Sequence, residues 1–186
     1  MFSPAASRNV KHWLFGYGSL IWRADFPYHE RRPAAIRGWT RRFWQGSHDH
    51  RGTPGSPGRV VTLVSQTGTL CAGIAYQVAG DVFEHLDHRE KNGYERVAVD
   101  IHLDGERGAG PRRVPGVTYI APPGNEAFLG PADAEQIAAH IARASGPSGS
   151  NADYLFELAA ALDALNVEDR HVTELASRVA ALEKAS

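Results

Sequence analysis

The sequence predicts an α+β fold in which a sheet curled into a barrel comes first along the chain and helices follow. Two patterns support this class. Up to residue 121 the apolar residues alternate or form short runs bounded by Gly and Pro, as in β-strands. From residue 131 onward they recur at helical spacing. The 186 residues, 42% hydrophobic and 22% charged, predict one globular domain over residues 12–186, preceded by a loose tail at 1–11.

The strand predictions rest on short apolar or alternating segments that end at turn residues. They cover residues 12–16, 34–44, 60–64, 70–78, 94–103 and 116–121. The segment 46–58 is too rich in Gly and Pro for a helix or a central strand. Loops of this length inside a domain are usually functional or disordered. Residues 104–114 form a second polar connection.

Helical spacing predicts one short helix among the strands, over residues 81–90, and three more after the last strand. The first of these begins at Pro131, because Pro suits the first helical turn. The second begins at Ser150, where Asp153 completes a capping box. The third begins at Glu168. We interpret the apolar stripes of these helices as faces that pack on the core.

Composition argues against several classes of partner. A net charge of -1 provides no electrostatic footprint for nucleic acid or for a membrane surface. The apolar runs are too short to span a bilayer, and the N-terminus does not resemble a signal peptide, so we predict a cytoplasmic protein. Arg37, Arg41 and Arg42 lie among aromatic residues, a pattern that also occurs where RNA bases stack. The neutral charge balance favours a strand with one exposed, charged face.

The segment Phe15-Gly16-Tyr17-Gly18-Ser19-Leu20 is the first candidate binding element. Gly16 and Gly18 allow a positive φ and a close approach of the backbone to another group. Several N–H groups facing one way would bind a carboxylate or an oxyanion, although an ordinary glycine-rich turn would have the same sequence. The segment lacks the Lys of a P-loop and the G-x-S-x-G spacing of a hydrolase. We therefore predict that Ser19 forms hydrogen bonds and is not a nucleophile.

Two charged residues lie where they could act on a substrate. Arg59 stands where the long loop enters a strand, a position that suits a bidentate pair with a carboxylate; a surface salt bridge is the alternative. Glu90 ends a predicted helix just before the turn at Asn92-Gly93. The turn could hold this carboxyl in a cleft, although a Glu among charges at a helix end is usually solvated. Tyr94 and Tyr154 are candidates for pocket walls that carry hydroxyl donors.

No metal or cofactor site is predicted. His48, Asp49 and His50 resemble metal ligands, but no second cluster follows them at a recognisable spacing. The one cysteine, Cys71, lies in an apolar run and is interpreted as a small buried side chain.

Several stretches together match one family. They are Phe15-Gly16-Tyr17-Gly18-Ser19-Leu20-Ile21-Trp22, Arg42-Phe43-Trp44-Gln45-Gly46-Ser47 with Asp49-His50-Arg51-Gly52, Pro57-Gly58-Arg59-Val60-Val61-Thr62-Leu63-Val64, Leu86-Asp87-His88-Arg89-Glu90-Lys91-Asn92-Gly93-Tyr94, and Gly146-Pro147-Ser148-Gly149 with Asn151 and Tyr154-Leu155-Phe156-Glu157-Leu158-Ala159. In this order, over about residues 12–165, they resemble the ChaC-type γ-glutamylcyclotransferases, which act on glutathione.

The resemblance implies a compact mixed β-barrel with flanking helices and a helical C-terminal part. It implies that the glycine loop binds the γ-glutamyl group and that Glu90 transfers the proton, while the substrate's own α-amine attacks its γ-carbonyl. The products would be 5-oxoproline and Cys-Gly, with no cofactor. Two alternatives stay open: a cyclotransferase for other γ-glutamyl amino acids or amines, and a non-catalytic binder of γ-glutamyl ligands. The oligomeric state is not predicted.

Overall fold

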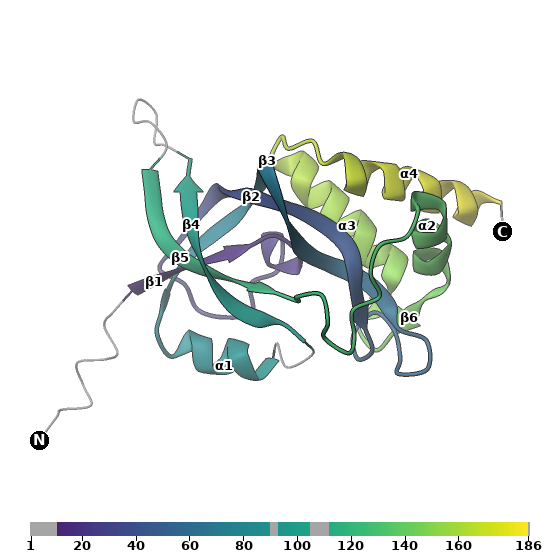
Figure 1. Ribbon diagram of the computed structural model, residues 1–186, viewed down its shortest axis with the longest axis horizontal. Coiled ribbons are helices and arrows are strands. Elements are labelled where there is room, and N and C mark those ends of the chain that lie inside the picture. Colours follow the sequence, from purple (N-terminus) through teal and green to yellow (C-terminus); the bar gives the residue numbers. More distant parts are fainter. Residues whose placement is uncertain (1–10, 90–92, 105–111, 186) are drawn as a thin grey trace, which may run out of the picture.

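The computed structural model describes residues 11–89, 93–104 and 112–185, so residues 1–10 of the predicted tail and Glu90 lie outside the described residues, whereas Lys11 belongs to the first strand. The strands are β1 (Lys11–Gly16), β2 (Glu30–Ser47), β3 (Gly58–Ala79), β4 (Glu95–Leu103) and β5 (Arg112–Ile120). They form a closed barrel in the order β1-β3-β2-β4-β5 (Figure 1). Neighbours are antiparallel, except that β1 and β5 are parallel and close the barrel at Leu14 and Val117. The predicted α+β fold with a mixed barrel is confirmed.

The prediction of separate strands at 60–64 and 70–78 was wrong, because both belong to β3. Its two halves pair with the same neighbour, β2: Leu70 lies opposite Arg37 and Ser65 opposite Trp39. The polar residues between Ser65 and Leu70 form a bulge, and on the β2 side Gly38 takes a positive φ of 80°. The long loop is shorter than predicted, because β2 continues to Ser47 and β3 begins at Gly58.

The helices are α1 (Val82–Arg89), α2 (Ala134–Arg143), α3 (Asn151–Ala164) and α4 (Arg170–Lys184). Figure 1 shows α3 and α4 along one side of the barrel with α2 at their end, and α1 at the opposite end of the molecule. A short hairpin, β6 (Ser145–Gly146) and β7 (Gly149–Ser150), connects α2 to α3.

Side-chain caps fix where the C-terminal helices begin. Ser150 caps α3 as predicted, since its side chain accepts a hydrogen bond from the Asp153 N–H. The predicted starts of the other two were early. Asp133 caps α2, so Pro131 precedes the helix, and Asp169 caps α4.

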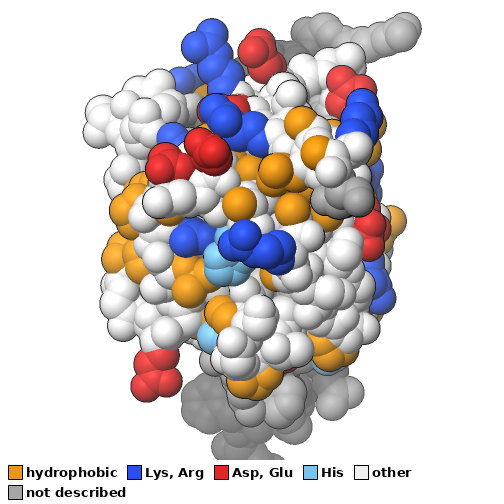
Figure 2. All heavy atoms as spheres, turned by 90° about the vertical axis from the view of Figure 1, so that its right-hand side faces the viewer, with side chains coloured by type: hydrophobic (Ala, Val, Ile, Leu, Met, Phe, Trp, Pro, Cys, Tyr) orange, Lys and Arg blue, Asp and Glu red, His pale blue; other side chains and the backbone are white. Residues whose placement is uncertain are grey.

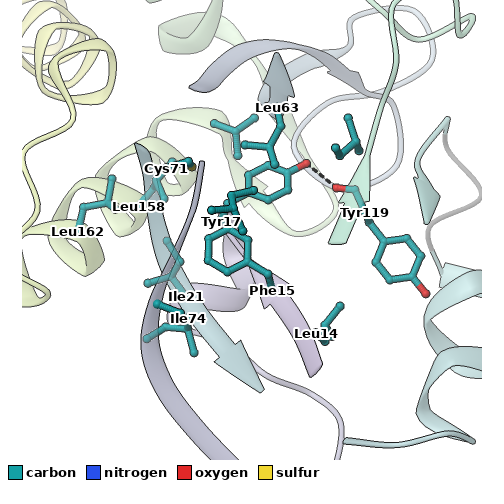
Figure 3. Close-up of a cluster of buried hydrophobic side chains, with 14 of the residues drawn as sticks. Leu14, Phe15, Tyr17, Ile21, Leu63, Cys71, Ile74, Tyr119, Leu158 and Leu162 are labelled. Carbon is teal, nitrogen blue, oxygen red and sulfur yellow. Dashed lines mark hydrogen bonds between the residues drawn. The ribbon is translucent and has the colours of Figure 1, made fainter. Parts of the chain in front are cut away.

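The core fills the barrel and continues beneath the helices. Leu14 and Phe15 of β1 and Ile74 of β3 belong to one core cluster, and all three are almost fully buried (Figure 3). Burial also raises the pKa of the Cys71 thiol, consistent with its interpretation as a small core side chain. The buried end of β1, Trp13 to Gly16, therefore fixes the start of the glycine-rich segment.

One face of the molecule has a mixed character. Figure 2 views the side of the molecule that carries α2 and β6, and there acidic, basic and apolar side chains are interspersed. Across the described ranges, no helix is both long and apolar enough to cross a membrane. The cytoplasmic location stays a prediction.

Candidate active site

The glycine-rich segment leaves β1 and forms a short 3₁₀ turn, η2 (Ser19–Ile21). The expected positive φ at Gly16 and Gly18 is not found, since Gly18 has a φ of -117° and Gly16 is not among the residues with positive φ. Space explains the glycines instead. A Cβ on Gly16 would lie 2.4 Å from the Cβ of Leu20, and one on Gly18 would lie 3.1 Å from the Tyr154 hydroxyl.

Buried donors hold the carbonyl groups of this turn. Arg41 Nε donates to the Tyr17 carbonyl at 2.6 Å, and the Tyr76 hydroxyl donates to the Leu20 carbonyl at 2.6 Å. The Gly18 carbonyl accepts from the Ile21 N–H at 2.9 Å. Because a trans peptide is planar, each N–H points opposite to the carbonyl of its own peptide unit. The N–H groups of Gly18 and Ser19 therefore point away from the donors that hold those carbonyls.

A small inner pocket of about 80 Å³ lies against the turn. Its lining combines the glycine segment, two barrel strands and α3: Phe15, Gly16, Tyr17, Gly18, Ser19, Leu20, Val61, Tyr94, Thr118, Tyr119 and Tyr154. Eight of the predicted binding residues are thus brought together, namely the six of the glycine segment with Tyr94 and Tyr154. No charged side chain lies among the described residues of this lining.

The tyrosines of the inner pocket are held by hydrogen bonds and stacking. The Tyr17 hydroxyl donates to the Tyr119 carbonyl at 2.7 Å (Figure 3), and the Tyr94 hydroxyl donates to the Val61 carbonyl at 2.8 Å. Tyr154 packs edge-to-face on Trp22, with ring centroids 5.6 Å apart. The walls of the pocket are therefore fixed before any ligand arrives.

A wider cleft of about 420 Å³ shares Ser19, Tyr94 and Tyr154 with the inner pocket, so the two form one site. Its other lining residues are Trp22, Arg23, Asp25, Gly46, Ser47, Asp49, His50, Arg51, Val60, His85 and Ser148. The site is therefore apolar and aromatic at its inner end and charged at its outer end.

Arg51 is the most firmly held cation of the outer cleft. Its guanidinium donates to the Ser150 carbonyl at 3.1 Å and to the Glu157 carboxylate at 3.2 Å, and it lies over the Tyr154 ring at 5.6 Å. The loop that presents it requires Gly52, because a Cβ there would lie 2.0 Å from the Gly58 nitrogen.

Arg59 does not reach the pocket, contrary to the expectation that it pairs with a substrate carboxylate. Its side chain is buried and lines neither the inner pocket nor the outer cleft. One guanidinium nitrogen, Nη1, donates to the carbonyls of Phe43 and Gly130, and burial lowers its pKa. Arg59 therefore connects the backbone of the barrel to the backbone of a loop. Because the side chain is buried, the alternative of a surface salt bridge is wrong as well.

Arg41 was expected on an exposed, charged face and is instead 1% exposed. Besides the Tyr17 carbonyl, it donates to the Ala72 carbonyl and to the Asp169 carboxylate, each at 2.6 Å. Asp169 also caps α4, so one side chain connects the glycine turn, β3 and the C-terminal helix.

Glu90, the predicted proton-transfer residue, lies outside the described residues. It directly follows α1, whose His85 lines the outer cleft, and precedes Tyr94, which lines both parts of the site. Its flanking chain on both sides therefore contributes to the site.

A family model described as ChaC-like protein matches residues 12–182. The chain belongs to the ChaC-like family. It is 47% identical over 176 residues to an Arabidopsis thaliana protein named γ-glutamylcyclotransferase 2-3, covering 90% of this chain and 87% of the relative. It is 42% identical over 153 residues to the human glutathione-specific γ-glutamylcyclotransferase 1, covering 79% of this chain and 68% of that protein. A crystal structure of a yeast γ-glutamylcyclotransferase specific to glutathione superposes with a TM-score of 0.85 at 34% identity, covering 92% of this chain and 96% of that one.

Sequence reasoning missed part of the site of this ChaC-like protein. Arg23 lies three residues beyond the glycine segment, and Tyr119 lies between the buried Thr118 and Ile120 on β5, so position relative to recognised elements is the signal that could have found them. Within the described ranges, no three His, Cys, Asp or Glu side chains are placed to hold a metal ion together.

Proposed function

We propose that this protein is a glutathione-specific γ-glutamylcyclotransferase, which degrades glutathione to 5-oxoproline and Cys-Gly. The observation that carries the proposal is the two-part site: an uncharged pocket against the glycine turn opens into a charged cleft. The γ-glutamyl group fits the first part and Cys-Gly the second. The names of the human and yeast relatives support the same substrate.

The chemistry needs little machinery because the substrate supplies its own nucleophile. The α-amine attacks the γ-carbonyl, a C–N bond closes a five-membered ring, and the bond to the cysteine nitrogen breaks. No water is consumed. Holding the substrate in the folded conformer removes much of the entropic barrier, which is the role we assign to the rigid walls around Tyr94 and Tyr154.

Two further tasks fall to the protein. The α-amine must lose a proton and the leaving amine must gain one, and we assign both transfers to Glu90, a group of the kind that typically contributes roughly 10²–10⁴ in rate. The developing oxyanion needs hydrogen-bond donors, and we assign this role to the N–H groups of Gly18 and Ser19. The orientation of their peptide units supports this assignment. Ser19 contributes hydrogen bonds only.

The proposal is tested by incubating the purified protein with glutathione, without metal or nucleotide, and measuring 5-oxoproline and Cys-Gly by mass spectrometry. γ-Glutamyl-alanine is run beside it, because the name of the Arabidopsis relative specifies no substrate. We expect product from glutathione. Turnover of γ-glutamyl-alanine alone would assign the protein to other γ-glutamyl compounds, and product from neither would favour a non-catalytic binder.

Glu90→Gln separates the proton-transfer role from binding. The amide keeps the shape of the side chain but cannot accept the proton, so we expect kcat to fall about 10²-fold or more with little change in glutathione affinity. Glu84→Gln, an exposed substitution on α1, is the matched control. Near-normal turnover by purified Glu90→Gln would remove Glu90 from the mechanism.

A further inference from the structure

Glutathione carries a second carboxylate, on its glycine, and under the proposed function this group leaves with Cys-Gly. The glycine lies two residues beyond the scissile γ-carbonyl, about 7 Å along an extended chain. The inner pocket, at about 80 Å³, is too small to hold the whole tripeptide, and its described lining has no charged side chain. The glycine carboxylate therefore lies in the outer cleft.

The outer cleft contains four side chains that could bind an anion: Arg23, His50, Arg51 and His85. Arg51 is already paired with the Glu157 carboxylate and stacked on Tyr154. His50 lies 3.1 Å from the Ser148 hydroxyl and 3.8 Å from the Asp49 carboxylate. A histidine also lacks the planar fork with which a guanidinium matches both oxygens of a carboxylate.

Arg23 differs from Arg51 and His50. Among the described residues it has neither a hydrogen-bond nor an ion-pair partner for its side chain, and it is exposed at the cleft. Its backbone is fixed to the glycine turn, since its N–H donates to the Ser19 carbonyl at 2.8 Å. A long cationic side chain is thus anchored beside the inner pocket and extends into the cleft.

Two acidic side chains also line the outer cleft and would repel a substrate carboxylate. Asp25 and Asp49 line the same space, and a like charge disfavours an incoming carboxylate. Arg51 is offset by Glu157, and Arg23 is the other guanidinium in the lining of the cleft.

We propose that Arg23 binds the glycine carboxylate of glutathione and thereby favours the tripeptide over γ-glutamyl dipeptides. The inference rests on the proposed function. In a dipeptide such as γ-glutamyl-alanine the carboxylate lies one residue, about 3.5 Å, closer to the scissile bond, and so out of register with a cation placed for the tripeptide. Arg23 also takes the carboxylate-pairing role that the sequence suggested for Arg59.

The test compares glutathione with its glycine monoethyl ester, in which an ethyl group replaces the negative charge of the glycine carboxylate. Kinetics are measured for the wild type, Arg23→Gln and Arg23→Lys. Arg143→Gln is the control, because Arg143 is also exposed, has no side-chain partner among the described residues and lies outside the cleft. Circular dichroism confirms that each variant is folded.

We expect Arg23→Gln to lower kcat/KM for glutathione about tenfold, mainly through KM, and to leave the ester unaffected. Arg23→Lys keeps the charge, so its kcat/KM for glutathione should fall less, and its kcat/KM for the ester should not change. The wild type should itself use the ester about tenfold less well than glutathione. An equal loss on both substrates, or no loss on glutathione, would overturn the subsite. If the wild type forms no 5-oxoproline from either substrate, the proposed function itself fails and the subsite fails with it.

Discussion

Acidification should destabilise the fold through His171, a residue on α4 that faces the barrel. Its Nε2 accepts a hydrogen bond from the Phe43 N–H at 3.1 Å, so the ring must be neutral there. Phe43 lies within the register shift of β2 between Arg42 and Gln45. Burial, with a smaller contribution from the positive charge of Arg42, lowers the pKa of His171 to about 4.

The magnitude follows from the gap between this pKa and the ordinary histidine pKa of 6.5. Above pH 6.5 the ring is neutral in the folded and in the unfolded chain, and its contribution to stability is complete. As the pH falls from 6.5 toward 4, the unfolded chain binds a proton that the folded chain does not. Each pH unit costs about 1.4 kcal/mol, so about 3 kcal/mol is lost across the window. That is a large share of the roughly 5–15 kcal/mol that stabilises a typical domain.

The measurement is urea unfolding, followed by circular dichroism, of the wild type and His171→Gln between pH 7.5 and 4. Glutamine can accept the Phe43 N–H bond but does not titrate, so groups that titrate in both proteins cancel in the difference. The free energy of unfolding of the wild type relative to the variant should fall by about 3 kcal/mol over the window. A difference that does not change with pH would refute the reasoning.

Two further predictions concern residues that hold the site without lining it. Arg41→Lys keeps a charge but not the fork, so we expect a loss of about 1–3 kcal/mol in unfolding free energy and a raised KM for glutathione; an unchanged KM would separate Arg41 from the site. Gly52→Ala places a Cβ against backbone at Gly58, whereas Gly55→Ala in the same loop meets no atom within 4 Å. Differential scanning fluorimetry should show a Tm loss for the first alone, and equal Tm values would contradict the packing argument.

The fold was largely predictable because its signals are local. Alternation in β4 places Ile101 and Leu103 inward. A period of two or a helical spacing can be recognised from residues that are close together in the sequence. Boundaries were less predictable where a partner decides them. The two halves of β3 are one strand because β2 runs beside both. α2 begins after Asp133, because the aspartate cap overrides the proline signal.

The destinations of the arginines were not predictable from local pattern. Arg41 donates a hydrogen bond to a carboxylate 128 positions away in the sequence, and Arg59 donates to carbonyls 16 and 71 positions away. A guanidinium is ordinarily solvated, and only the closed barrel shows which carbonyls need a buried donor. The glycine segment could be recognised as a site, but the cause of its glycines, the close approach of Leu20 and Tyr154, depends on the fold.

These buried arginines explain how a site without a charged inner wall can still be rigid. A reaction whose nucleophile lies within the substrate gains most from holding the substrate folded, and a mobile wall would lose that gain. Tyr76 fixes the Leu20 carbonyl, and Arg41 fixes the Tyr17 carbonyl, which leaves the Gly18 N–H of the same peptide unit pointing away from Arg41. Arg41 and Tyr76 donate these hydrogen bonds from within the core, each at 2.6 Å. The hydrogen bonds offset the free-energy cost of desolvating the two buried side chains. The barrel therefore orders the turn in advance, and the described lining of the inner pocket beside it carries no charged side chain.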